Sequence, residues 1–428
     1  MTPPHPKTLT LSAALMLGGF SAVAVPLWAQ QTTPELRGVQ LRFDLDFGLE
    51  SQTNRTLDVT DPGTTTEART GLTIGILSAT RTQRFAFDLG GELRGLDGPT
   101  SQDSGFVNPF AFLNYDRSSA STRLSLSASI RESDLNNDGF EFDEDTLAFT
   151  FVEGSATRVN SNLSAEMNFR DDAPFGFGVL VRYGENNFSD GVATGVVGTA
   201  LNDTQRLTFG VTARFEFNEV TRLDSALTYT GFEEDNVTGT RDTWVLSNDL
   251  TIERPRGNLT FGLDITDTPE GSRVGATVGR SLAYPLGIVS GRLGLTRGSN
   301  GETFFNGGLN LTRALPNGSL NFDLARTVRS GSLEDTEQLS TSLRVGYLRE
   351  LTPLSSLSVD FNWAEVEQTD AGTDTTSASI EASYRRELTQ DWGVNMGVRH
   401  RFRDDGVNGS TNSNEVFLNL RRAFLTRF

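Results

Sequence analysis

The sequence contains no cysteine, a single lysine (Lys7) and only two histidines, His5 and His400. The lack of cysteine excludes disulfide bonds and thiolate metal sites, and it is typical of proteins exported to a compartment that oxidises thiols. The formal net charge is −18. Because nucleic acids attract basic proteins, this excess of acid argues against a nucleic acid as partner.

Long apolar runs are absent after residue 29, where no stretch reaches the roughly eighteen residues that a membrane helix needs. The mean hydropathy is −0.31, as in many soluble proteins. A transmembrane β-barrel has an equally low value, because only alternate residues of each strand face lipid. Composition therefore excludes a helical membrane protein and leaves a β-barrel open.

Residues 1–29 have the pattern of a secretory signal peptide. A short polar start that includes Lys7 precedes an apolar run from Leu9 to Ala29, and a small residue ends that run. We expect cleavage after Ala29, with Ala24 as the alternative site. The segment 30–37 would then be a short periplasmic stretch, too short for a plug domain, before a barrel that spans 38–428.

Apolar and polar residues alternate from residue 38 onward. Because successive strand residues point to opposite faces, each segment has one apolar and one polar face. Segments of about ten to thirteen alternating residues have the length needed to cross a bilayer at a tilt. In the first segment the apolar set is Val39, Leu41, Phe43, Leu45, Phe47 and Leu49.

The connections between these segments fall into two classes, short turns and longer loops rich in acids, Gly, Asn or Thr. Tight periplasmic turns opposite longer outer loops are typical of outer-membrane barrels. If 133–157 is one long outer loop, the count is 20 strands, with 18 as the alternative, and both termini stay in the periplasm. The sequence thus predicts an all-β, transmembrane, antiparallel up-and-down β-barrel. The short turns are expected at 78–83, 117–121, 218–221, 254–257, 315–317, 351–355 and 388–391, and the longer loops also at 51–67, 97–105, 234–242, 367–374 and 404–413.

The last segment ends in an aromatic residue. Val416, Leu418, Leu420, Phe424 and Phe428 share one face, which Arg422 and Thr426 interrupt. This resembles the C-terminal signature that the barrel assembly machinery reads in outer-membrane barrels. The sequence therefore predicts an assembly signal at Phe428 and the assembly machinery as a partner during biogenesis.

The segments "GLESQTNRTLDVTDPGTTTEARTGLTIGIL", "SATRTQRFAFDLG" and "FNEVTRLDSALTY" carry a wider likeness. The layout resembles the β-barrel porin families of proteobacteria, including barrels associated with exopolysaccharide loci. This resemblance implies an outer-membrane barrel with a pore, and it implies no catalytic residues and no particular substrate.

Charged residues on the polar faces form the main candidate site. They are expected to point into the lumen, as a ladder of cross-strand ion pairs, as a transverse field that selects polar solutes, or as both. Pairing alone explains the triplet Arg399, Arg401 and Arg403 least easily. The predicted lumen-facing residues are Arg42, Arg94, Arg123, Arg131, Arg182, Arg206, Arg214, Arg344, Arg399, Arg401, Arg403, Asp44, Asp46, Asp88, Glu92, Glu216, Asp249, Asp264, Asp360 and Glu381.

The segment 133–157 carries the other candidate site. Asp134, Asn136, Asp138 and Asp145 have the spacing of oxygen ligands in a calcium loop, although a solvated acidic loop explains them too. No other cofactor is expected. His400, the one histidine after the signal peptide, shares a face with Val398 and Phe402, so an outward position at the rim is favoured over a role as a general base. No enzyme is predicted.

Three functions remain open from the sequence. The first is a porin-like channel for passive diffusion of small polar solutes, the second an outer-membrane component of exopolysaccharide export or assembly, and the third a non-conducting structural or adhesive barrel. Barrels of sixteen or more strands usually leave an aqueous channel, which favours the first two. The expected surroundings are outer-membrane lipids and lipopolysaccharide in the cell outer membrane, with the oligomeric state open.

We predict that the protein fractionates with the outer membrane and changes its gel mobility on boiling. Deleting Phe428 should lower the amount of this heat-modifiable form several-fold, because the assembly signal is lost. Phe217→Ala, which removes an aromatic ring from the apolar face of another segment, serves as control. Normal insertion of the Phe428 deletion would show that this residue is not a signal.

Overall fold

The computed structural model describes residues 38–55, 57, 63–99, 104–134, 140–143, 148–151, 153–170, 172–194, 202–235, 239–269, 271–330, 337–368, 374–404 and 409–428. The expected signal peptide and the segment 30–37 lie outside the described residues. The strands are β1 (Gly38–Thr53), β2 (Thr64–Ala79), β3 (Gln83–Asp97), β4 (Gly105–Ser118), β5 (Thr122–Asp134), β6 (Phe140–Asp143), β7 (Ala148–Phe151), β8 (Glu153–Phe169), β9 (Phe175–Thr194), β10 (Thr204–Asn218), β11 (Thr221–Glu234), β12 (Arg241–Arg254), β13 (Gly257–Thr268), β14 (Gly271–Tyr284), β15 (Gly287–Arg297), β16 (Thr303–Leu315), β17 (Gly318–Ser330), β18 (Glu337–Thr352), β19 (Ser355–Gln368), β20 (Asp374–Glu387), β21 (Trp392–Asp404) and β22 (Ser410–Arg427).

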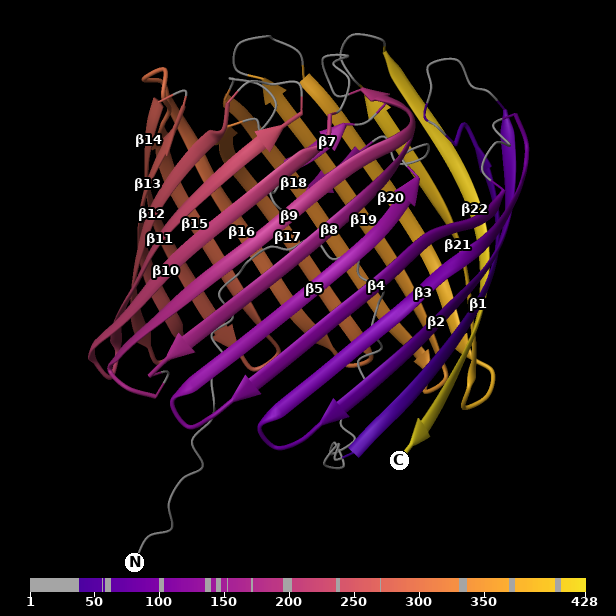
Figure 1. The fold of residues 1–428 in the computed structure, drawn as a ribbon, viewed down its shortest axis with the longest axis horizontal. Coiled ribbons are helices and arrows are strands. Elements are labelled where there is room, and N and C mark those ends of the chain that lie inside the picture. The colour runs from indigo at the N-terminus through magenta and orange to yellow at the C-terminus, as the bar shows by residue number, and fades with distance from the viewer. Residues whose placement is uncertain are drawn as a thin grey trace, which may run out of the picture.

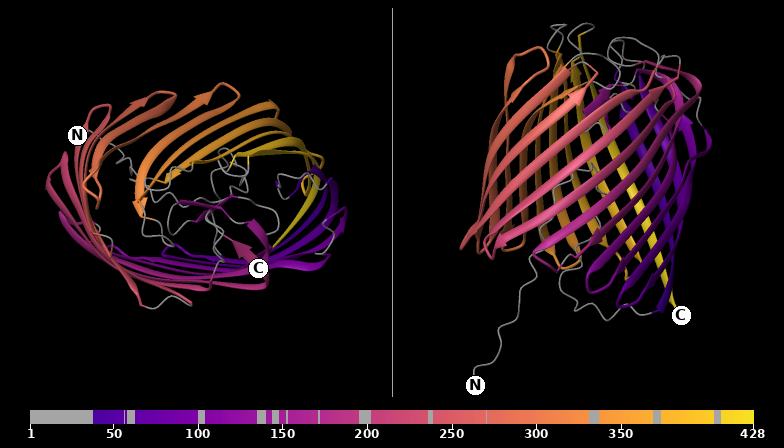
Figure 2. Two further views of the ribbon diagram at one scale, coloured as in Figure 1. Left: turned by 90° about the horizontal axis from the view of Figure 1, so that it is seen from above. Right: turned by 60° about the vertical axis from the view of Figure 1, so that its left-hand side comes forward.

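Twenty of these strands form one closed antiparallel sheet. Each strand pairs with the next along the chain, β5 pairs directly with β8, and β22 pairs with β1 to close the ring. Figure 1 shows the tilted strands of this barrel, and Figure 2 shows from above that the ring is oval. The prediction of an all-β barrel of 20 strands is confirmed.

Side chains divide between the two faces of the sheet as the alternation predicts. Large apolar side chains point outward and are exposed, among them Leu93, Phe217 and Leu293, at 60%, 63% and 58%. Their sequence neighbours point inward and are mostly polar or small. The outer wall is therefore apolar, as the hydrocarbon of a bilayer requires. No helix in the described part of the chain is long and apolar enough to cross a membrane.

The short connections all lie at one end of the barrel, and the longer ones lie at the other (Figure 1). In outer-membrane barrels the end with the short turns faces the periplasm. Several turns contain two residues between strands, such as 255–256 before Gly257. Gly257 has a φ of +127°, and a Cβ there would lie 2.2 Å from the carbonyl oxygen of Ser281, so this turn requires glycine.

Three expected loops differ from the structure, and the one expected at 404–413 is shorter because β22 begins at Ser410. The segment 133–157 adds no further strand to the barrel, as expected, but it is shorter than expected because β5 runs to Asp134 and β8 begins at Glu153. Within it, β6 and β7 form a separate hairpin. This hairpin lies inside the outline of the ring when the barrel is seen from above (Figure 2). The loop expected at 51–67 is shorter, because β1 continues to Thr53 and β2 begins at Thr64. Threonine favours strands, so pairing continues beyond the apolar band.

We predict that an outward charge is costly and an inward one is not. Leu293→Arg, in the middle of the outer face of β15, should destabilise the barrel by about 2–4 kcal/mol because an arginine enters hydrocarbon. Ser290→Arg, which points inward on the same strand, should change stability by much less. Urea unfolding in lipid vesicles measures both, and equal losses would contradict the assignment of the two faces.

Candidate functional site: the inner wall

The register of the sheet places all the predicted lumen residues at inward-facing positions. They do not form one site. Instead they divide into local groups around the ring, and the groups with described contacts lie on β1–β3, on β10 and on β20–β22. Their effect on transport stays a prediction.

The first group lies on β1, β3 and β22 toward the short-turn end. Arg42 contacts Asp44 at 2.7 Å and Asp88 at 2.8 Å, and Arg421 contacts Asp44 at 3.0 Å. Asp44 is buried, whereas the Arg42 side chain is 46% exposed. The cations thus cover a buried carboxylate and keep part of their surface in the lumen. Sequence reasoning missed Arg421, although its parity opposite Leu420 could have identified it.

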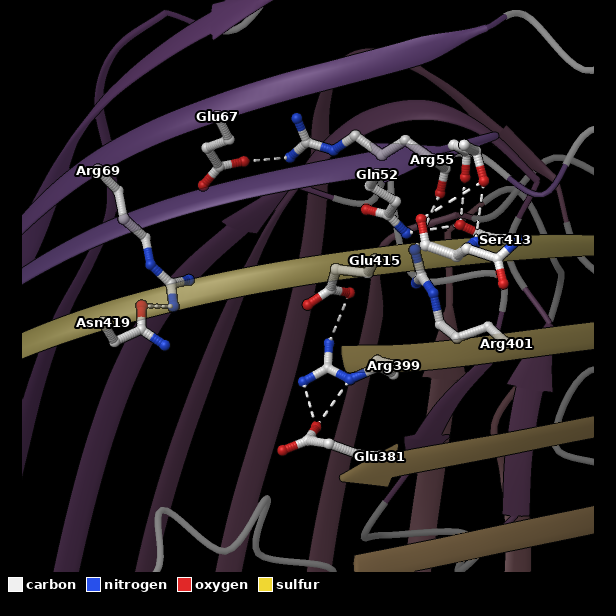
Figure 3. A network of polar contacts seen from close by, with 12 residues as sticks. Gln52, Arg55, Glu67, Arg69, Glu381, Arg399, Arg401, Ser413, Glu415 and Asn419 are labelled. Carbon is white, nitrogen blue, oxygen red and sulfur yellow. Dashed lines mark hydrogen bonds and ion pairs between the residues drawn. The ribbon is translucent and has the colours of Figure 1, made fainter. Parts of the chain in front are cut away.

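The second group lies on β20–β22 (Figure 3). Arg399 donates two hydrogen bonds to Glu381, at 2.7 and 2.9 Å, and one to Glu415 at 3.1 Å. The Glu415 side chain is only 3% exposed, and the Arg399 guanidinium also lies over the ring of Phe417. Arg399 is thus ion-paired with carboxylates on both neighbouring strands. From the sequence, pairing alone was the weakest explanation for this arginine and for Arg401 and Arg403.

The third group holds the chain that follows β1 against the inner wall. Arg55 contacts Glu67 of β2 at 2.8 Å, and Arg94 of β3 lies 3.7 Å from the same carboxylate. Arg401 of β21 donates a hydrogen bond to the carbonyl oxygen of Arg55, as Figure 3 shows beside the Arg55–Glu67 pair. All three charged side chains of the Arg55–Glu67–Arg94 group are nearly buried.

The same segment is bonded to the start of β22. Thr411 donates a hydrogen bond to the carbonyl oxygen of Leu57 at 3.0 Å. Ser413 donates to the carbonyl oxygen of Thr53 and accepts from Gln52 at 3.0 Å. We call residues 53–55 and 57 the inward segment. It covers part of the wall at the long-loop end, where Arg403, Thr411 and Ser413 are buried.

Arg214 stabilises the short-turn end. Its guanidinium donates hydrogen bonds to the carbonyl oxygens of Arg170 and Ala173, and it lies 3.5 Å from Glu216. This arginine therefore has a structural role in fixing the turn between β8 and β9. The remaining predicted residues, including Arg123, Arg131, Arg182, Arg344 and Asp360, lie on other inward positions of the ring.

The predicted calcium ligands cannot be placed. Asn136, Asp138 and Asp145 lie outside the described residues, and Asp134 is described only as the last residue of β5. Among the described residues no group of three or more potential ligands could hold a metal ion. His400 points outward on β21 and hydrogen-bonds Asn414 at 2.9 Å. The backbone N–H of Phe428 donates to Val39 at the closing edge of the barrel.

Comparison with known proteins finds likeness in fold only. No protein-family model matches the chain, and no curated protein is similar to it in sequence. The siderophore receptor PirA of Acinetobacter baumannii is 8% identical, with 91% of this chain and 81% of that chain covered and a TM-score of 0.54. A mutant of the ferric enterobactin receptor PfeA of Pseudomonas aeruginosa is 8% identical, with 91% and 80% covered and a TM-score of 0.52. PirA of P. aeruginosa is 10% identical, with 90% and 80% covered and a TM-score of 0.50.

The apolar outer wall, the closed ring and these likenesses define a class. The chain is an outer-membrane β-barrel protein of the Gram-negative type.

We predict that Arg399 neutralises a carboxylate that cannot otherwise be buried. Arg399→Gln should destabilise the barrel by about 2 kcal/mol, because Glu415 loses its charged partner. Adding Glu415→Gln should recover most of this loss. Arg42→Gln is the control, and its more exposed pairs should cost about 1 kcal/mol or less. Urea unfolding measures the cycle, and additive losses would show that Arg399 and Glu415 are not coupled.

Proposed function

We propose that this protein is a porin-like channel for the passive diffusion of small polar solutes across the outer membrane. One observation carries the proposal. On β10–β16 the inward-facing positions hold hydroxyl, amide, carboxylate and guanidinium groups that remain accessible in the lumen, among them Thr212, Asp249, Arg292, Asn310 and Thr312. Such a wall can hydrate a solute but offers it little apolar contact.

The dimensions of the ring support the same function. Barrels of 16–18 strands leave an aqueous channel and barrels of 22 strands enclose a plug domain, so a ring of 20 strands is wide enough for water. The inward segment and the β6–β7 hairpin lie within the outline of this ring, where they would narrow the path. We therefore infer a channel whose width is set by these segments and whose ion preference is set by inward charges.

The channel would be assembled by, and lie among, the components of the outer membrane. We infer membership of the porin-type barrels of proteobacteria, assembly by the barrel assembly machinery through Phe428, and contact with lipopolysaccharide in the outer leaflet. A weakly bound calcium ion in 133–157 would fit the acidic composition of that segment. The ring of His400 lies on the outer wall, and no catalytic role is proposed for it.

Planar-bilayer recordings test the channel. We expect steady conductance, and the triple variant Arg399→Ala, Arg401→Ala and Arg403→Ala should shift the preference toward cations because three inward positive charges are removed.

The matched control removes three outward guanidinium groups instead, by Arg254→Ala, Arg313→Ala and Arg349→Ala. It should leave the ion preference unchanged, since these residues face away from the lumen. An electrically silent wild-type barrel would contradict the proposal and favour a non-conducting structural role.

A further inference from the structure

A row of arginines runs along the outer wall near the short-turn end. From β12 to β22, every strand that descends toward this end carries an outward-facing arginine within its last six residues, whereas the ascending strands carry none there. Their side chains are exposed, except that Arg422 is half-buried. The row consists of Arg254, Arg280, Arg313, Arg349, Arg386 and Arg422.

The alternation of the strands separates these cations from neighbouring acids. Arg349 precedes Glu350 and Arg386 precedes Glu387, and in each pair the arginine points outward and the glutamate inward. Glu387 is ion-paired on the inner side with Arg385, at 3.0 Å. Within the described part of the chain, no guanidinium of the row is ion-paired with a carboxylate. The charge of the row is therefore available to groups outside the protein.

Aromatic side chains mark the membrane border at the same level. Tyr347 precedes Arg349 by two residues, and Tyr384 precedes Arg386 by two residues, so each tyrosine and its arginine share the outer face. Tyrosine and tryptophan gather at the border between hydrocarbon and headgroups. An arginine two residues further along a strand lies about 7 Å away along that strand, which at a tilt of about 40° is about 5 Å closer to the periplasm, toward the headgroups.

One part of the row forms a compact patch on three adjacent strands. Arg422 of β22 lies over the ring of Trp392 of β21, at 5.1 Å, and over the ring of Phe424, at 4.2 Å. Arg386 lies on the outer face of β20, next to the β21 position of Val394. Trp392 is thus flanked by a guanidinium on each side. Such stacking fixes a guanidinium and leaves its edge free for a phosphate.

The opposite end of the same wall carries the opposite charge. Above the apolar band, the outward positions hold several acids beside two arginines, Arg297, which is exposed, and Arg326, which is ion-paired with Glu367 at 3.4 Å. The short-turn end therefore presents a row of exposed cations on its outer face, whereas the outer face of the long-loop end carries mainly acids. The outward acids at the long-loop end include Asp242, Asp267, Glu365, Glu367 and Asp374.

We propose that the arginine row is a binding surface for anionic phospholipid headgroups of the periplasmic leaflet. The phosphate of a phosphatidylglycerol-type lipid accepts hydrogen bonds from the guanidinium groups, while its acyl chains lie along the apolar wall above them. Charge complementarity and the depth of the row select this occupant. The surface is independent of what passes through the lumen.

Trp392 allows a direct test, because it is the one tryptophan of the described residues at this border. In a background with Trp28→Phe, Trp244→Phe and Trp363→Phe, the barrel is inserted into mixed vesicles of dioleoylphosphatidylglycerol and dioleoylphosphatidylcholine. Quenching of Trp392 by the brominated form of each lipid gives their relative affinity. We expect a preference for phosphatidylglycerol that falls up to about 25-fold in Arg386→Gln with Arg422→Gln, since each guanidinium near an anionic lipid contributes about five-fold.

Two controls separate charge from structure. Arg386→Lys with Arg422→Lys should keep most of the preference. Arg81→Gln with Arg84→Gln removes two positive charges from a short turn and from the inner face, and it should change nothing at Trp392. If the double Gln variant does not fold, Arg386→Gln alone should lower the preference about five-fold, since this arginine stacks on no ring of the described residues. Equal quenching by the two lipids in the unaltered barrel, or an unchanged preference in the folded Gln variants, would overturn the proposal.

Discussion

The pairing of β22 with β1 is the constraint on which the whole barrel depends. Hydrocarbon offers no hydrogen-bonding partner, so each backbone N–H and C=O in the membrane must pair with another strand, and an open sheet edge is not viable there. Closing the ring satisfies both edges at once, from Gln40 opposite Arg427 to Gln52 opposite Glu415. Once the ring is closed, the two-residue period of a strand assigns every side chain to lipid or to lumen.

Because of that alternation, one side of each strand faces lipid and the other side faces the lumen. Adjacent residues such as Arg386 and Glu387 carry opposite charges, yet the first faces the membrane border and the second faces the lumen. The inner wall balances its charges locally, with Arg399 between Glu381 and Glu415. The outer wall separates its charges along the barrel axis instead. A chain with a net charge of −18 thereby presents a basic border to one leaflet.

The sequence was sufficient to predict the strands and the inward position of the lumen charges that it singled out, because both follow from local alternation. The number of strands needed a further rule, the even number that places both termini in the periplasm. The sequence was insufficient where contacts are distant in the chain. The position of Arg55 depends on Arg401, 346 residues away, and the segment 51–67 was accordingly read as a simple loop. Likewise, alternation placed Arg399 in the lumen, but its partners follow from the register of three strands. The segment 133–157 was ambiguous because β7 alternates as a barrel strand does.

The inward segment also has a consequence for the seam between the first and last strands. It follows the first strand and is bonded to β21 and β22, through Arg401, Thr411 and Ser413, so it fastens the seam from inside in addition to the backbone ladder. Parting the first and last strands would break these bonds as well. Opening of the barrel toward the bilayer at this seam is therefore disfavoured.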